Sequence, residues 1–197
     1  MSAREIAIGI VGAGRIAERV HFDVLSRLRG VRVVGVADPA AERRAVAARR
    51  FPNALVLSDA ARLVADCPLD GLLICSPPAT HAEAAHIGID AGKHVYVEKP
   101  LALRLNDARE LVSSAQRAGV IAMIGFNYRH HPLVQQLKRA LAAGRVGEPL
   151  VLRTIFSAAT VERSDWERSP ASGGGVLLEL GSHHFDLARF LFDDEVS

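Results

Sequence analysis

A short apolar segment near the N-terminus, residues 6–11 (IAIGIV), runs directly into the glycine pattern of residues 12–17 (GAGRIA). Isoleucine and valine dominate the first part, and apolar residues at helical spacing follow, so the stretch predicts a strand, a tight turn and a helix. Those apolar residues are Ile16, Val20, Val24 and Leu28. Gly12 can adopt the backbone angles of the turn, and Gly14 lets a pyrophosphate approach without a Cβ in the way. Taken alone, the stretch fits either a phosphate cradle or a plain glycine-containing turn.

Apolar runs of the kind found in buried parallel strands recur along the first two thirds of the chain. They occupy residues 6–11, 31–37, 54–57, 69–75, 93–97 and 120–125. Segments with helical spacing or helix-capping residues separate them. This alternation is typical of an α/β fold with a doubly wound parallel (Rossmann) sheet. We therefore predict a dinucleotide-binding domain over residues 1–125.

The pattern changes after residue 125. A helix is predicted over residues 132–143, a longer strand over residues 149–159 and a last helix over residues 176–192. These elements no longer alternate as in a doubly wound sheet, so residues 126–197 are assigned to a second, α+β domain.

Asp38 ends the second apolar run, about two dozen residues after the glycine turn. An acidic side chain at this point can accept hydrogen bonds from a ribose 2′-hydroxyl and repels a 2′-phosphate. This favours NAD over NADP, although Arg43 and Arg44 leave NADP open. The alternative is that Asp38 and Pro39 only begin the next helix, where Asp suits the N-cap and Pro the first turn.

Two further loops follow predicted strands at their carboxyl ends, where an open α/β sheet binds its ligands. Ser76 and Pro77 follow the fourth run, and Glu98 and Lys99 follow the fifth. Lys99 is one of three lysines among 24 basic residues, and a lysine can shift its pKa when desolvated. We assign to the cofactor site Gly12, Gly14, Arg15, Ile16, Asp38, Ser76, Pro77, His81 and Glu98. For His81, an ordinary surface or core histidine is the alternative.

The last predicted helix carries three titratable residues at spacings of four and three, Glu179, His183 and Asp186. This spacing places them on one face, opposite a row of leucines that starts at Leu177. The stripe is either a catalytic surface or an exposed helix face with a Glu/His pair.

Composition narrows the class of partner. A net charge of +2 without a basic run excludes a nucleic-acid or membrane-surface protein. No apolar stretch reaches the ~20 residues of a membrane span, and no Cys/His/Asp cluster has metal-ligand spacing. Of the two cysteines, Cys67 and Cys75, the second lies inside an apolar run and is interpreted as a buried, reduced thiol. The chain is therefore interpreted as cytoplasmic and its partner as a small molecule.

Seven segments together resemble the Gfo/Idh/MocA family, the dehydrogenases related to glucose-fructose oxidoreductase and inositol dehydrogenase. They are GIVGAGRIA, VADP, SPPATHAEAA, GKHVYVEKPLA, GFNYRHHP, VGEP and GGGVLLELGSHHFDLARFL. The resemblance implies an NAD(P)-dependent enzyme that moves hydride between a sugar, cyclitol or related polyol hydroxyl and nicotinamide. A dinucleotide-binding sensor or partner subunit without turnover is the alternative. A third interpretation is a reaction that oxidises the sugar only transiently, with no net NADH.

The resemblance also implies residue roles. Lys99 would contact the reacting substrate oxygen, and His183 would act as general acid and base. Glu179, where the family pattern usually has Asp, would orient His183 or contact substrate. Residues 126–197 would be part of a longer domain for substrate and homo-oligomer contacts. We therefore expect a truncated chain, or one that completes its sheet with another chain, and expect it to bind dinucleotide but turn over substrate poorly.

Overall fold

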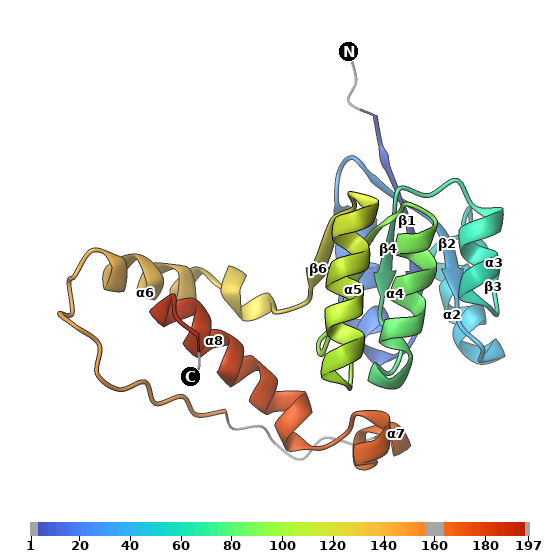
Figure 1. Ribbon diagram of the computed structural model, residues 1–197. Coiled ribbons are helices and arrows are strands. Elements are labelled where there is room, and N and C mark those ends of the chain that lie inside the picture. The colour runs from blue at the N-terminus through green and yellow to red at the C-terminus, as the bar shows by residue number, and fades with distance from the viewer. Residues whose placement is uncertain (1–3, 157–163, 196–197) are drawn as a thin grey trace. The chain divides into compact units, whose positions relative to one another are not determined.

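The computed structural model describes residues 4–156 and 164–195, and the chain divides into two compact units, Met1–Ile124 and Gly125–Ser197. The first unit holds a six-stranded parallel sheet in the order β3-β2-β1-β4-β5-β6 (Figure 1). Its strands are β1 (Ile6–Val11), β2 (Val31–Ala37), β3 (Leu55–Leu57), β4 (Gly71–Ile74), β5 (His94–Val97) and β6 (Ala122–Ile124). The prediction of a doubly wound parallel sheet is confirmed.

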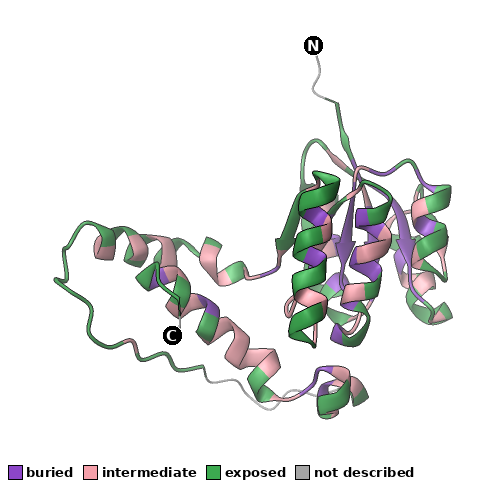
Figure 2. Cartoon of the chain, in the orientation of Figure 1, coloured by how far each residue is buried: buried purple, intermediate pink, exposed green. Residues whose placement is uncertain are grey.

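Helices cover both faces of this sheet and enclose two apolar cores (Figure 2). The helices are α1 (Phe22–Arg27), α2 (Ala41–Arg50), α3 (Ala60–Asp66), α4 (His81–Asp90) and α5 (Leu105–Ala118), with the short turn η2 (Pro78–Thr80) before α4. Leu63, Ile89 and Leu111 bury α3, α4 and α5 against one face. Phe22 and Ala47 bury α1 and α2 against the other. Both faces of the strands are therefore apolar, which explains their continuous hydrophobic runs.

The helix after the glycine turn faces the core differently from its predicted pattern. The expected apolar stripe of Ile16, Val20, Val24 and Leu28 is 41–52% exposed. Ala17 and Phe22, five positions apart, are buried instead. The cause is a π-helical turn, η1 (Ala17–His21), in which the Phe22 N–H bonds to the Ala17 carbonyl. A π turn holds one more residue than an α turn, so positions five apart share a face.

The described residues of the second unit form helices and no strand. They are η3 (Asn127–His130), α6 (Pro132–Ala142), α7 (Asp165–Arg168), η4 (Pro170–Ser172), η5 (Leu177–Gly181) and α8 (Ser182–Phe192). The strand predicted over residues 149–159 is wrong for residues 149–156, and residues 157–159 lie outside the described part. A strand needs a neighbouring strand for its ladder of hydrogen bonds, and none is found in the described part of this unit. The predicted α+β character is accordingly not seen there.

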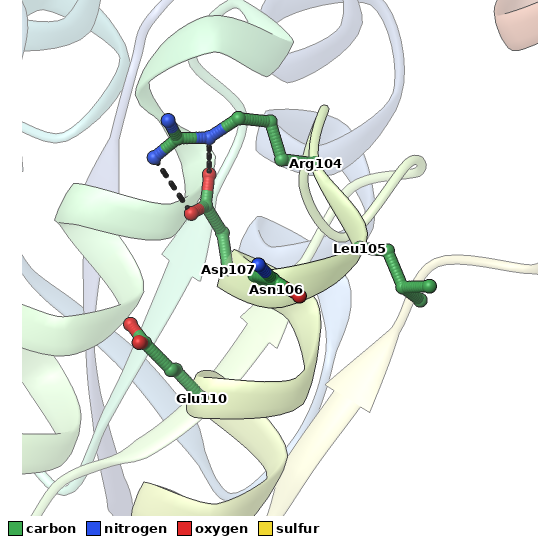
Figure 3. A pocket seen from close by; sticks show the side chains of 5 residues that line it. All are labelled: Arg104, Leu105, Asn106, Asp107 and Glu110. Carbon is green, nitrogen blue, oxygen red and sulfur yellow. Dashed lines mark hydrogen bonds and ion pairs between the residues drawn. The ribbon is translucent and has the colours of Figure 1, made fainter.

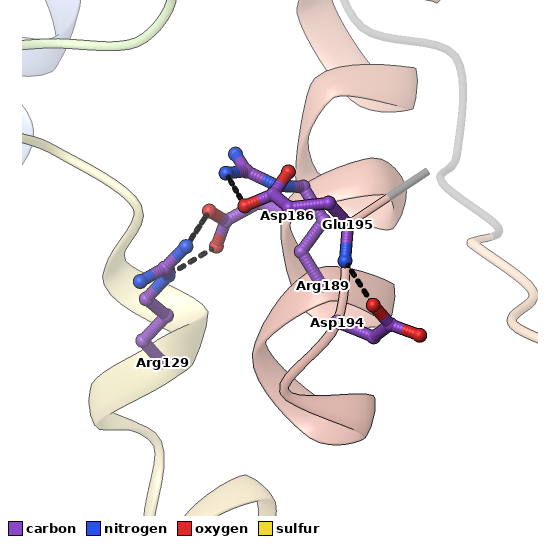
Figure 4. A network of polar contacts seen from close by, with 5 residues as sticks. All are labelled: Arg129, Asp186, Arg189, Asp194 and Glu195. Atoms are coloured by element: carbon purple, nitrogen blue, oxygen red, sulfur yellow. Dashed lines mark hydrogen bonds and ion pairs between the residues drawn. The ribbon is translucent and has the colours of Figure 1, made fainter. Parts of the chain in front are cut away.

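A partly buried ion pair joins η3 to α8 within the second unit (Figure 4). Nε and Nη2 of Arg129 donate to the Asp186 carboxylate at 2.6–3.0 Å. These bonds raise the pKa of Arg129, and the Asp186 side chain is only 3% exposed. The Arg129 guanidinium also lies 5.4 Å from the centre of the Phe190 ring. Asp186 thus fastens α8 to η3, and it is not an exposed member of the predicted stripe.

In residues 4–156 and 164–195, no helix combines the length and the apolar character needed to cross a membrane.

Candidate functional site

The glycine turn lies where three strands of the first unit end together. Gly12 has a φ of +90°, and a Cβ built on it would stand 2.5 Å from the Ser76 backbone nitrogen. The Gly12 N–H donates to the Ala37 carbonyl at the end of β2, and the Cys75 N–H donates to the Val11 carbonyl. Strand order reverses between β1 and β4, and open α/β sheets bind their ligands at such a reversal. Gly12 is therefore required both by its backbone angle and by the close approach of β4.

Gly14 differs from Gly12 in what constrains it. Its φ is not positive, and the nearest atom to an added Cβ would be Nη1 of Arg43 at 3.8 Å. Arg15 and Ile16 follow it and are exposed. The fold itself does not need glycine here, so the open backbone at Gly14 is available to a ligand.

The Asp38 carboxylate is 2% exposed and faces the glycine turn. Oδ2 accepts from the Ala13 N–H at 2.8 Å, and Oδ1 accepts from the Ala40 N–H at 2.9 Å. The N-cap of α2 is Ala40, so Asp38 is not the N-cap of that helix, and this alternative is wrong. Asp38 braces the turn, and each of its carboxylate oxygens keeps a lone pair that can accept a further hydrogen bond.

His81 is 1% exposed and bridges two loops at the same edge of the sheet. Its Nδ1 lies 2.7 Å from the Pro100 carbonyl oxygen and its Nε2 lies 2.8 Å from the Ser76 carbonyl oxygen. Both ring nitrogens face protein carbonyls, so neither is turned toward a ligand. A neutral imidazole donates one hydrogen bond, and only the protonated ring donates to both carbonyls. Burial lowers the pKa of His81, although the two carbonyls oppose this shift.

The lowered pKa of His81 predicts a pH-dependent stability. The unfolded chain protonates this histidine at a higher pH than the folded chain does, so the free energy of unfolding decreases as pH falls below about 6.5. We expect His81→Asn to remove this contribution, which is at most about 1.4 kcal/mol per pH unit. Urea denaturation of both proteins between about pH 7.5 and about pH 5.5 measures it. Identical pH dependence in the two proteins would contradict the prediction.

Glu98 and Lys99 lie at this edge because β1, β4 and β5 are neighbouring parallel strands. Val11 pairs with Ile74, and Ile74 pairs with Val97, so the residues after them emerge side by side. The Glu98 N–H donates to the Ile74 carbonyl at 2.9 Å, and the Lys99–Pro100 peptide bond is cis. Glu98 and Lys99 are half-buried. The structure thus brings Gly12, Ser76 and Lys99 to one edge of the sheet.

The second unit holds Glu179 in η5 and His183 in α8, both half-buried. The His183 ring packs on Tyr128, with ring centroids 4.7 Å apart, and edge-on against Phe126 at 6.1 Å. The turn between the two titratable residues is π-helical, and the Ser182 N–H bonds to the Leu177 carbonyl. Leu177 is exposed, contrary to the apolar face predicted for it. These aromatic contacts fix the position of the His183 imidazole on α8.

Two family models match the chain. Residues 6–126 match the model of an oxidoreductase family with an NAD-binding Rossmann fold, and residues 134–197 match a Gfo/Idh/MocA C-terminal domain. The chain belongs to the Gfo/Idh/MocA family.

Three relatives illustrate the membership. The chain is 31% identical to the myo-inositol 2-dehydrogenase of Thermotoga maritima over 96% of its length and 55% of that protein. It is 33% identical to the 1,5-anhydro-D-fructose reductase of Ensifer adhaerens, over 95% of this chain and 56% of that one. The crystal structure of GenD2 from gentamicin A biosynthesis, in complex with NAD, superposes with a TM-score of 0.84 at 31% identity, over 97% of this chain and 54% of that one. The chain thus spans about half the length of these Gfo/Idh/MocA proteins.

A hollow of this Gfo/Idh/MocA chain lies at the start of α5 (Figure 3). Arg104, Leu105, Asn106, Asp107 and Glu110 line it. Arg104 donates two hydrogen bonds to Asp107, at 2.8 and 2.9 Å, which lower the pKa of that carboxyl group. The hollow contains none of the predicted site residues. Within the described ranges, no group of three or more His, Cys, Asp or Glu side chains is placed to hold a metal ion.

Sequence analysis missed one residue beside the predicted Gfo/Idh/MocA site. Nε2 of His21 lies 2.7 Å from Oε1 of Glu98. If residues 16–28 formed the regular α-helix that the sequence predicts, nothing in the apolar pattern would place His21 beside the site. The π turn brings it to Glu98, and apolar spacing contains no signal for such a turn.

Proposed function

We propose that this protein is an NAD-dependent oxidoreductase that transfers hydride between a hydroxyl-bearing carbon of a sugar, cyclitol or related polyol and nicotinamide. The observation that carries the proposal is the glycine turn. At the strand-order reversal, Gly12 packs so closely against the end of β4 that no side chain fits. The backbone at the neighbouring Gly14 is not covered in this way and is accessible to a ligand. The relative from Thermotoga maritima is a myo-inositol 2-dehydrogenase, which supports the polyol class.

The first unit supplies the proposed cofactor site. Backbone N–H groups from Gly14 onward would hold the diphosphate at the start of the helix, where the dipole favours an anion. Arg15 would add positive charge, and Ile16 would cover the turn. Ser76 and Pro77, at the end of β4, would line the same crevice. Bound NAD supplies the nicotinamide carbon that accepts hydride.

Three side chains would carry the proton and charge changes. In the oxidative direction the carbinol carbon loses hydride with its electron pair, and its hydroxyl loses a proton. His183 would take that proton, because imidazole gains and releases protons near neutral pH. Lys99 would stabilise the negative charge that develops on the oxygen. Glu179 would orient His183.

Deuterium transfer tests the proposal directly. Polyols and sugars labelled at one carbinol carbon are incubated with the purified protein and NAD⁺, and the NADH formed is analysed for deuterium. We expect labelled NADH and a carbonyl product even if turnover is slow. Binding of NADH without any transfer would favour a dinucleotide sensor instead. A sugar product formed without net NADH would favour the transient oxidation.

We also propose a cytoplasmic homo-oligomer. Cys67 and Cys75 are both free and buried, and burial raises the pKa of both thiols, which suits a reducing compartment. In the second unit Leu150, Val151 and Ile155 are 74–87% exposed. Exposed apolar side chains of this kind are usually covered by another part of an assembly, here a second copy.

A further inference from the structure

His21 is a partly buried histidine to which the proposed reaction gives no role. Its side chain is 15% exposed, and that of its partner Glu98 is 16% exposed. The Nε2–Oε1 distance of 2.7 Å is that of a charge-assisted hydrogen bond. Because an ionised carboxylate only accepts, His21 donates from Nε2. The bond connects η1, directly after the glycine turn, to the end of β5.

A phenol and a thiol also lie within the electrostatic influence of Glu98. The Tyr96 ring meets the His21 ring edge-on at 6.0 Å, and Tyr96 and Glu98 point to the same side of β5 because they are two residues apart. Burial, with the Glu98 charge added, raises the pKa of Tyr96 to about 12. The same causes raise the pKa of the buried Cys75 thiol. The phenol and the thiol therefore stay neutral beside this carboxylate.

The residue on the other side of Lys99 is also held by a histidine. Pro100 offers its carbonyl oxygen to Nδ1 of His81 at 2.7 Å. Lys99 is thus flanked in the chain by Glu98, bonded to His21, and by Pro100, in contact with His81. We call residues 98–100 the lysine loop.

We propose that His21 is a positioning residue, which holds the lysine loop through Glu98 and so sets the place of the Lys99 ammonium group. The inference rests on the role proposed above for Lys99. Without the His21 bond, Glu98 is free to turn, and a displacement of about 1 Å at a catalytic group can lower a rate about 100-fold. The loss falls on turnover, because the glycine turn that holds the diphosphate keeps its own hydrogen bonds to Ala37 and Asp38.

Variants of His21 and Glu98, with a control at Arg19, test the inference through kinetics. We expect His21→Leu to lower kcat about 10- to 100-fold with little change in NADH affinity, and His21→Gln, whose amide can donate from a similar place, to recover most of it. Glu98→Leu combined with His21→Leu should be no slower than the slower single variant, since each single change removes the same hydrogen bond. Arg19→Leu, at an exposed position of the same turn, should keep the wild-type rate.

A measurement without turnover separates this inference from the proposed function. Nitrogen NMR of the imidazole should show the proton on Nε2 of His21 in the wild type, and a changed Nε2 resonance in Glu98→Leu, which has no acceptor oxygen. If the wild type oxidises no polyol, the proposed function fails, and the resonance still decides whether the bond exists. An unchanged resonance overturns the inference. So does a His21→Leu variant that keeps the wild-type kcat in an active enzyme.

Discussion

Replacing Gly12 by alanine is expected to destabilise the first unit strongly and to weaken dinucleotide binding with it. At a φ of +90° any L side chain is strained, by about 1–3 kcal/mol. The new Cβ would also lie 2.5 Å from the Ser76 nitrogen and 2.7 Å from the Cys75 carbonyl carbon. These are backbone atoms of the loop directly after β4, so the ends of β1 and β4 would have to separate. We expect urea denaturation to show a loss of at least about 3 kcal/mol.

Gly14→Ala is the matched control for this substitution. Its Cβ would meet only the flexible end of Arg43, at 3.8 Å, so stability should change by less than about 0.5 kcal/mol. The methyl group would occupy the space through which the diphosphate approaches the backbone. Loss of a charged hydrogen bond there corresponds to about 1.5–3 kcal/mol, or roughly 10- to 100-fold weaker NADH binding by calorimetry. Unchanged NADH affinity in Gly14→Ala would show that the diphosphate does not bind at this turn.

Lys99→Ala and His183→Ala are each expected to lower polyol-dependent NADH formation about 100- to 10,000-fold while NADH affinity stays nearly constant. One substitution removes the cation that stabilises the developing alkoxide, and the other removes the group that takes its proton. Steady-state rates and NADH titrations of the same preparations measure the two effects separately.

Neighbouring residues of the same type provide the controls. Lys93→Ala removes a lysine that precedes β5. His184→Ala removes the histidine next to His183; Nδ1 of His184 lies 2.5 Å from the Thr154 hydroxyl oxygen. Both controls should retain the wild-type rate. Wild-type rates in Lys99→Ala and His183→Ala would instead show that neither side chain takes part in the chemistry.

Much of the first unit follows from patterns local in the chain. Continuous apolar runs separated by helical segments predict a parallel sheet buried on both faces, and the strand order bears this out. The glycine turn, Ser76 and Lys99 could be placed at one sheet edge because the carboxyl ends of neighbouring parallel strands meet there. The roles of Lys99, Glu179 and His183 came from a family resemblance, and they remain predictions.

Other features required contacts between distant residues. The structure turns Asp38 inward to the Ala13 N–H, closes both nitrogens of His81 against carbonyls, and pairs Asp186 with Arg129. Each of these side chains had been interpreted from its neighbours in the chain alone. In these three cases the bonded partner lies up to 57 residues away in the chain. Periodicity contains no information about that choice.

The π turn η1 separates what could be predicted from the sequence from what depends on the tertiary structure. Residue types and their spacing were sufficient for the strands, the glycine turn and the class of fold, because these depend on which residues are apolar and which backbone angles glycine permits. The extra residue in η1 was settled by packing, which buries Ala17 and Phe22 in the core and leaves the stripe that begins at Ile16 exposed. A helix with a wide turn satisfies the same local preferences as a regular one. Only the fit of its side chains against the finished sheet decides between them, and with it whether His21 reaches Glu98.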